Sequence, residues 1–198
     1  MEELVLVEGI WLGRGGQGIV LASYILAEAA IIEGKVAMAM PEFGAERRGA
    51  PVRAYNRILA PGRTKGIGIL PRTPVEQADF LVVMEPHLLA SRSLFPKLKE
   101  NATVLVSTER RPEEVCKMLE IVDKSSPRVY TVDAIKVAVE TIGRPIVNTT
   151  LLGALVRVRE GLVDKSSLER ALANRLSGEI LERNVEALRR GYEEVIGP

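Results

Sequence analysis

Hydrophobic and polar positions alternate along the first three quarters of the chain in a pattern that predicts strands and helices in turn. Short apolar runs bounded by turn residues predict strands over 5–12, 36–40, 52–59, 80–84, 103–106 and 129–132. Longer segments with helical periodicity or an opening proline predict helices over 19–33, 86–99, 112–122 and 134–142. Strands that alternate with helices are typical of a layered α/β fold.

The spacing of these segments also indicates the directions of the strands. The segment 52–59 follows the strand at 36–40 with little room for a crossover helix, and a parallel return needs about a dozen residues or more. The run at 80–84 is apolar throughout, which is typical of a strand covered on both faces. We therefore predict a three-layer α/β/α fold with a mixed, mostly parallel sheet.

From residue 148 onward the pattern is helical and contains no strand. Helices are expected over 151–160, from a capping box at 166–169, and over 179–196. We expect one domain over residues 1–198. Its α/β core covers 1–147, and a C-terminal helical segment over 148–198 packs on that core.

The helix expected over 19–33 has too few polar residues for an ordinary surface helix. Twelve of its fifteen residues are apolar, and Ser23, Glu28 and Glu33 do not share one face. A helix that is apolar nearly all round must be covered nearly all round. Either the C-terminal helices or a partner chain covers it, and a homodimer of the isolated chain is one such arrangement.

Composition excludes several classes of protein. The net charge is +1, so no overall basic field favours nucleic acid, and no apolar run reaches the roughly 20 residues of a membrane span. With one cysteine, Cys116, and one histidine, His87, the chain cannot form an internal disulfide or a multi-histidine metal site. We expect a cytoplasmic protein that holds no metal by itself.

The strongest local motif lies between the first strand and the first helix. It consists of Gly13, Arg14, Gly15, Gly16, Gln17 and Gly18. Glycines let the backbone approach an anion, and the amides with the helix N-terminus supply partial positive charge. A dinucleotide site also needs an acidic residue at the end of the second strand, where this chain has Met40 and Pro41. The motif favours an anion site, while a nicotinamide cofactor and a ligand-free turn stay open.

A second motif, Pro-Glu-Phe-Gly-Ala-Glu-Arg-Arg-Gly-Ala-Pro, covers residues 41–51. Six basic residues and two acidic ones lie between Glu42 and Lys65, and arginine binds phosphates and carboxylates through two parallel hydrogen bonds. The alternative is a solvated loop in which Glu46 pairs with a neighbouring arginine. No nucleophile is paired with a base, so we assign no catalytic residue and expect a component of an enzyme.

The two motifs at this separation resemble the gamma subunit of 2-oxoacid:ferredoxin oxidoreductases, most closely the pyruvate and 2-ketoisovalerate type. The correspondence continues through 78–86, 147–155 and 182–192, and so covers nearly the whole chain. The 2-oxoglutarate type usually carries a tyrosine-containing second motif that ends in paired glycines. Phe43 and the Gly-Ala-Pro at 49–51 therefore favour pyruvate.

The resemblance implies a role in a larger enzyme. The complete enzyme converts a 2-oxoacid, coenzyme A and oxidised ferredoxin into acyl-CoA, carbon dioxide and reduced ferredoxin. Thiamine diphosphate, its magnesium ion and the 4Fe–4S clusters belong to partner alpha, beta and delta subunits. The gamma subunit is inactive alone, packs on these partners and helps bind coenzyme A. Besides the six residues of the glycine motif, we expect Glu46, Arg47 and Arg48 at the coenzyme. The rival hypotheses are a free-standing NAD(P)-dependent oxidoreductase and a purely structural scaffold.

Overall fold

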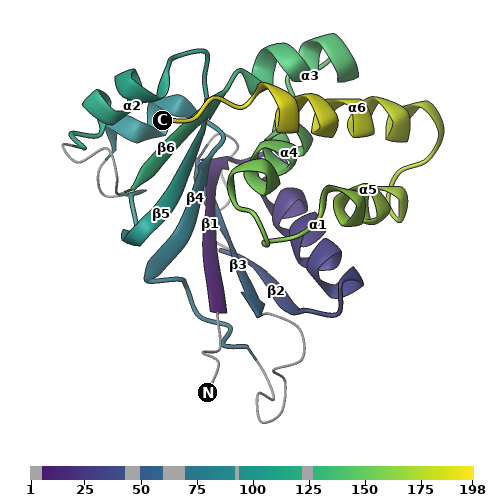
Figure 1. Ribbon diagram of the computed structural model, residues 1–198, viewed down its shortest axis with the longest axis horizontal. Helices are drawn as coiled ribbons and strands as arrows, with labels where there is room; N and C mark the ends of the chain where they lie inside the picture. Colours follow the sequence, from purple (N-terminus) through teal and green to yellow (C-terminus); the bar gives the residue numbers. More distant parts are fainter. Residues whose placement is uncertain (1–5, 43–49, 60–69, 92–93, 122–126) are drawn as a thin grey trace.

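The computed structural model describes residues 6–42, 50–59, 70–91, 94–121 and 127–198. A six-stranded sheet with the order β2-β3-β1-β4-β5-β6 forms its centre (Figure 1). The strands are β1 (Leu6–Arg14), β2 (Val36–Pro41), β3 (Pro51–Leu59), β4 (Gln77–Val83), β5 (Lys97–Ser107) and β6 (Arg128–Val132).

The sheet is mixed, as expected. β1, β4, β5 and β6 run parallel, whereas β3 is antiparallel to both β1 and β2. β2 and β3 form a hairpin because the segment between them is too short for a helical crossover.

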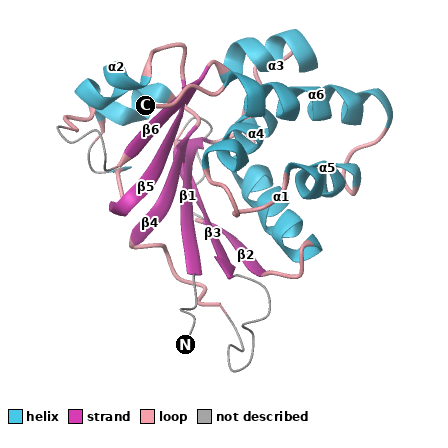
Figure 2. Ribbon diagram, viewed as in Figure 1, coloured by secondary structure: helices cyan, strands magenta, loops and turns pink. Residues whose placement is uncertain are grey.

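Helices cover both faces of the sheet (Figure 2). One face packs against α1 (Ile19–Ile32), α4 (Asn148–Val158) and α5 (Lys165–Ala173), and the other against α2 (Pro112–Met118) and the 3₁₀ helix η1 (Pro86–Ala90). Outside α4 lie α3 (Ala134–Ile142) and α6 (Gly178–Glu194). This arrangement confirms the three-layer α/β fold with a mixed sheet and C-terminal helices.

Helix α1 is covered on most of its surface. It packs on β2 and β3, while α5 covers another side. Glu28 pairs with Arg175, which follows α5, at 2.7 Å. Leu21, Tyr24 and Ile31 remain exposed, at 40%, 40% and 58%. The C-terminal helices therefore cover only part of the apolar surface of α1.

A buried polar network connects α1 to the sheet. The indole Nε1–H of Trp11 donates to Oδ1 of Asn56 over 2.8 Å, and Nδ2 of Asn56 donates to the carbonyl oxygen of Ser23 over 2.9 Å. The Ser23 hydroxyl donates to the carbonyl oxygen of Val20. These bonds satisfy polar groups from β1, β3 and α1 in one chain of contacts.

Two local expectations are wrong. The helix expected over 86–99 is the short η1, and residues 97–101 belong to β5, which pairs with β4 through an irregular register. Sheet pairing overrides the helical pattern of this polar segment. The capping box expected at 166–169 does not open α5: the N-cap is Asp164, whose backbone N–H donates to Oε1 of Glu33.

Candidate functional site

The chain leaves β1 and β4 toward opposite faces of the sheet. β1 leads through the glycine motif to α1, whereas β4 leads to η1 on the other face. The two strands are parallel neighbours, and the Met84 N–H donates to the carbonyl oxygen of Leu12 over 2.8 Å. Ligands of open α/β sheets bind in the crevice at such a point, outside the carboxyl ends of the strands. We call this place, with residues 13–18 and 85–87, the switch-point site.

Three glycines of the motif serve different purposes. A Cβ at Gly13 would lie 2.8 Å from Oε1 of Gln17 and 3.1 Å from Cβ of Met84, so glycine is needed there for packing. Gly18 has a φ of +78°, and a Cβ there would lie 2.6 Å from Nδ2 of Asn148. Gly16 has a φ of +94° and is exposed, and a Cβ there would meet no atom within 4 Å. Gly16 is therefore the point at which a ligand can approach the backbone.

The motif is held in shape by its own hydrogen bonds. The Arg14 N–H donates to Oε1 of Gln17 over 2.8 Å, and the Gln17 N–H donates to the carbonyl oxygen of Arg14 over 3.2 Å. Nε2 of Gln17 donates to Oε2 of Glu85 over 3.2 Å. Gln17 thus positions the loop against the end of β4. The exposed backbone at Gly16 and the first turn of α1 are the parts of the motif that can face an anion.

The second motif ends beside the first and begins at the end of β2, which β3 separates from the first motif. The Gly15 N–H donates to the carbonyl oxygen of Ala50 over 3.1 Å, and Arg14 pairs with Pro51 in the sheet. Glu42, at the other end, donates its N–H to the carbonyl oxygen of Arg53 over 3.0 Å. The structure therefore brings Ala50, which follows segment 43–49, to the switch-point site, whereas Glu42, which precedes the segment, lies on the far side of β3. Glu46, Arg47 and Arg48 lie within that segment, outside the described residues.

Two other arginines of this basic stretch have structural partners. Arg53 donates to the carbonyl oxygen of Leu94 over 2.7 Å, and its guanidinium lies 3.9 Å from the carboxylate of Glu42. Arg57 is buried and bonds to Glu8 at the opposite end of the sheet. The local excess of positive charge in the sequence therefore overstates the charge available at one site.

Tyr55 lies next to Glu42 at the end of the β2–β3 hairpin. The residue is 2% exposed, and its hydroxyl donates to the Glu42 carboxylate. Burial, and then the hydrogen bond to Glu42, raise the pKa of Tyr55 to about 12. The phenol therefore stays protonated and keeps Glu42 in place beside segment 43–49.

This raised pKa predicts a loss of stability in alkali. An unfolded tyrosine ionises near pH 10, and the folded one near pH 12, so stabilisation present below pH 10 is lost as the pH rises through this window. Wild type should lose about 2 kcal/mol more than Tyr55→Phe between pH 9 and pH 12, measured by urea unfolding. Parallel pH profiles for the two proteins would contradict this.

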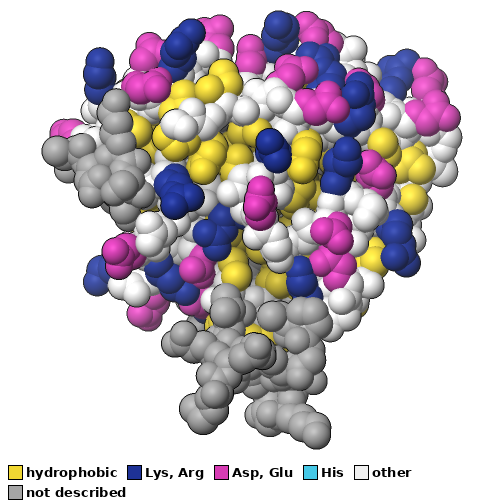
Figure 3. Space-filling model, viewed as in Figure 1, with side chains coloured by type: hydrophobic (Ala, Val, Ile, Leu, Met, Phe, Trp, Pro, Cys, Tyr) yellow, Lys and Arg dark blue, Asp and Glu magenta, His cyan; other side chains and the backbone are white. Residues whose placement is uncertain are grey.

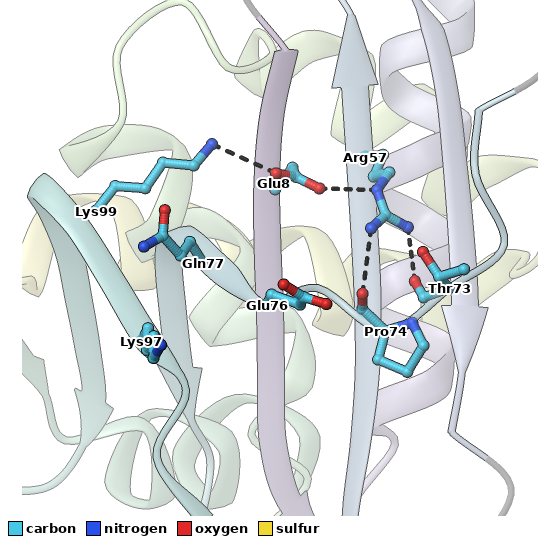
Figure 4. A pocket seen from close by; sticks show the side chains of 8 residues that line it. All are labelled: Glu8, Arg57, Thr73, Pro74, Glu76, Gln77, Lys97 and Lys99. Atoms are coloured by element: carbon cyan, nitrogen blue, oxygen red, sulfur yellow. Dashed lines mark hydrogen bonds and ion pairs between the residues drawn. The ribbon is translucent and has the colours of Figure 1, made fainter.

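A hollow of about 620 Å³ lies at the opposite end of the sheet, at the amino ends of the parallel strands (Figure 4). Arg57 donates to Glu8 over 2.8 Å and to the carbonyl oxygens of Pro71 and Thr73 over 2.7 Å each. Burial alone would lower the pKa of Lys99, but its hydrogen bond to Asp79 and the charges of Asp79 and Glu8 raise it. This network secures the stretch before β4 to the sheet.

A second hollow, of about 660 Å³, lies between the amino end of β6 and the carboxyl end of α4. Arg128, Arg157 and Arg159 line it together with Tyr130 and Glu160.

On the face of the molecule in view, basic and acidic side chains are interspersed (Figure 3). Within the described ranges, no group of three His, Cys, Asp or Glu side chains could hold a metal ion. No helix of the described chain is long and apolar enough to cross a membrane.

Sequence reasoning missed two residues that support the switch-point site, Asn148 and Glu85. Asn148, at the start of α4, is buried and contacts Gly18, with Nδ2 3.5 Å from its carbonyl oxygen. Glu85 supports Gln17, and the exposed His87 follows at the rim, with Nε2 4.0 Å from a Glu85 oxygen. Glu85 and Asn148 belong to segments that carried the family resemblance, which was the available signal for both.

The described part of the site defines a class of protein. It presents a glycine turn, a helix N-terminus and a hydrogen-bonded frame, and no nucleophile paired with a base occurs among these described residues. A backbone turn and a helix N-terminus of this kind are typical of α/β proteins that bind ligands at the carboxyl ends of their strands.

Comparison with known proteins shows the family of this chain. Residues 8–194 match the family model described as pyruvate ferredoxin/flavodoxin oxidoreductase. The chain is 45% identical, over 92% of its length and 93% of the relative's, to the pyruvate/ketoisovalerate oxidoreductases common subunit gamma of Pyrococcus abyssi. The chain belongs to the pyruvate ferredoxin/flavodoxin oxidoreductase family, which confirms the resemblance seen in its motifs.

Solved structures give the same result. The crystal structure of pyruvate oxidoreductase subunit PORC from Thermotoga maritima is similar at a TM-score of 0.83 and 39% identity, with 97% of this chain and 98% of that chain covered. The gamma subunit of keto/oxoacid ferredoxin oxidoreductase from Geobacter sulfurreducens is similar at a TM-score of 0.70 and 27% identity, with 96% of both chains covered. The expected fold and family are thus confirmed over nearly the whole chain.

Proposed function

We propose that this chain is the gamma subunit of a cytoplasmic pyruvate-type 2-oxoacid:ferredoxin oxidoreductase and that its switch-point site helps bind coenzyme A. The names of the similar gamma and PORC subunits support the first part. One observation carries the second: the Gly15–Ala50 hydrogen bond joins the glycine motif to the end of the arginine-containing segment. Amide donors and guanidinium groups together suit the phosphates of coenzyme A.

The chemistry of the complete reaction requires other subunits. In this proposal thiamine diphosphate, magnesium and the 4Fe–4S clusters lie in alpha, beta and delta subunits, and ferredoxin reacts with the complex. The coenzyme's thiol must reach the carbon that is acylated there. This chain holds the phosphate end, with the backbone at Gly16 allowing close approach and Arg47 or Arg48 supplying positive charge.

The rival nicotinamide hypothesis lacks its ribose-binding residue. Such a site needs a free carboxylate near the end of the second strand. Glu42 is the acidic residue nearest to the end of β2, but its carboxylate accepts a hydrogen bond from the Tyr55 hydroxyl and lies 3.9 Å from Arg53. These contacts favour a structural role for Glu42 and therefore favour coenzyme A over NAD(P).

Replacing Arg48 by alanine in the reconstituted complex should weaken apparent coenzyme A affinity by roughly tenfold to a hundredfold. The loss of one charge-assisted contact costs about 1.5–3 kcal/mol, and 1.4 kcal/mol is a factor of ten. The pyruvate KM should barely move. Arg72→Ala, at an exposed residue beside the network at the opposite end of the sheet, is the matched control.

The scaffold hypothesis predicts a different result for the same variant. If Arg48 only joins subunits, the complex of Arg48→Ala will dissociate on a sizing column. Its coenzyme A constant will be unchanged in the fraction that stays assembled. That outcome would assign Arg48 to an interface and overturn its role at the coenzyme.

A further inference from the structure

The two edges of the sheet differ in whether a further backbone segment pairs with the edge strand. At one edge, the C-terminal tail covers β6, because Thr131 and Ile196 exchange backbone hydrogen bonds of 2.9 and 2.8 Å. At the other edge, β2 pairs with β3 on one side, and no strand within the described residues pairs with its other side. An open edge presents a row of backbone donors and acceptors that another strand can bind.

The register of the hairpin shows which backbone groups face outward. Glu42 N–H donates to the carbonyl oxygen of Arg53, so Glu42 points its backbone groups toward β3. Inward and outward residues alternate in an antiparallel ladder. Ala37, Ala39 and Pro41 therefore point outward. Ala37 and Ala39 each offer one N–H and one carbonyl oxygen at the open edge.

This edge carries little of the usual protection against pairing, since Pro41 at the end of β2 is the one such residue in the strand. Natural edge strands are blunted by charges, bulges or prolines. Residues 36–40 read Val-Ala-Met-Ala-Met, with proline only at the end of the strand. The charges nearby are paired within the chain: Lys35 with Glu33 at 2.8 Å, and Glu28 with Arg175 at 2.7 Å. The strand itself has no charged side chain that would repel a second strand.

The helix that packs on β2 adds apolar surface near this edge. α1 contacts β2 and β3 more extensively than β1, so it lies toward the open edge. It exposes Leu21, Tyr24 and Ile31. A strand pair bordered by two such helices would bury both backbone and apolar groups.

We propose that β2 is the interface of a homodimer in which the β2 strands of two copies pair antiparallel about a two-fold axis at Met38. In this register Ala37 of each copy exchanges two hydrogen bonds with Ala39 of the other, and one sheet continues through both molecules. The pairing is self-complementary, as a two-fold interface requires. Among the described residues beside β2, Lys35 and Glu28 are paired within the chain, so these two charges neither repel a second copy nor attract an oppositely charged partner.

The surface required for such a dimer is modest. A stable interface buries about 800 Å² per copy, which is under a tenth of the 10672 Å² surface of this chain. The paired strands and the exposed face of α1 are the groups that would supply this area.

Sedimentation velocity of the full chain at micromolar concentrations should show a reversible dimer. Ala39→Pro removes an outward N–H from each copy, and so two of the four new hydrogen bonds, without touching the ladder to β3. The dimer Kd should rise about tenfold or more, while Ala39→Ser, which keeps the N–H, should dimerise like wild type. A wild-type monomer, or Ala39→Pro that dimerises normally, would overturn the proposal.

Cross-linking tests the register independently of the proline variant. In the proposed dimer, the Met38 residues of the two copies form a non-hydrogen-bonded pair. Their Cα atoms lie about 4.5 Å apart, so cysteines at this position are within reach of a disulfide. The two Met40 residues would lie about 13 Å apart along the strands. Met38→Cys should therefore form a covalent dimer under mild oxidation and Met40→Cys should not. The buried Cys116 is common to both. Equal cross-linking of the two variants, or none with Met38→Cys, would rule out this interface.

Discussion

Replacing Gly153 by alanine should destabilise the protein by about 3 kcal/mol. Helices α4 and α6 cross in backbone contact. A Cβ at Gly153 would lie 1.9 Å from the carbonyl oxygen of Leu188, and one at Gly191 would lie 2.0 Å from that of Thr150. Alanine in a helix interior ordinarily stabilises by about 0.5–1 kcal/mol relative to glycine, so the expected change has the opposite sign. Urea unfolding at neutral pH measures it.

Gly143→Ala is the control for this prediction. Gly143 ends α3 at a φ of +79°, and a Cβ there would meet no atom within 4 Å. Its substitution should lower the free energy of unfolding by about 1 kcal/mol, from backbone strain alone. If Gly153→Ala proved as stable as wild type, the close crossing of α4 and α6 would be wrong.

Replacing Arg57 by methionine should lower the free energy of unfolding by about 3–5 kcal/mol. The Arg57 side chain is only 5% exposed. It forms an ion pair with Glu8 and donates hydrogen bonds to the carbonyl oxygens of Pro71 and Thr73. Removing Arg57 leaves these carbonyl oxygens without their donor and leaves Glu8 with only the longer ion pair to Lys99, at 3.4 Å. Thermal and urea unfolding should both show the loss.

A surface ion pair provides the comparison. Arg189 bonds to Glu186 and Glu193 on the exposed face of α6, so Arg189→Met should have a far smaller effect on stability than Arg57→Met. The double variant Glu8→Gln with Arg57→Met should recover part of the loss, because it removes a carboxylate that has lost its shorter ion pair and keeps only Lys99, at 3.4 Å. Equal costs for the Arg57 and Arg189 variants would contradict a buried network at the amino ends of the strands.

Most of the fold could be predicted because its signals are local. Continuous apolar runs marked the central parallel strands, and the short spacing before residues 52–59 predicted the antiparallel hairpin. The two wrong predictions concern segments whose structure depends on residues far away in the sequence. Residues 97–101 join β5 because β4 lies beside them, and α5 begins at Lys165 with its N-cap bonded to Glu33, far away in sequence.

For the candidate site too, the local motifs were predictable from the sequence and the long-range contacts were not. The glycine motif lies where its strand–turn–helix context placed it, and the second motif ends beside it. Sequence could not show that Gln17 supports the loop through Glu85, or that Asn148 packs on Gly18, because these contacts join segments far apart in the chain. Nor could it show that Arg57 points to the other end of the sheet.

Hydrogen exchange of the reconstituted complex, with and without coenzyme A, tests the proposed coenzyme role most directly. Coenzyme A should slow exchange in peptides that cover residues 13–21 and 42–53 of this chain, because its phosphates would occupy the exposed backbone at Gly16 and the adjoining segment. NADH at the same concentration should leave these peptides unchanged. Slowed exchange confined to the partner subunits, with no change at residues 13–21, would contradict a coenzyme site in this chain.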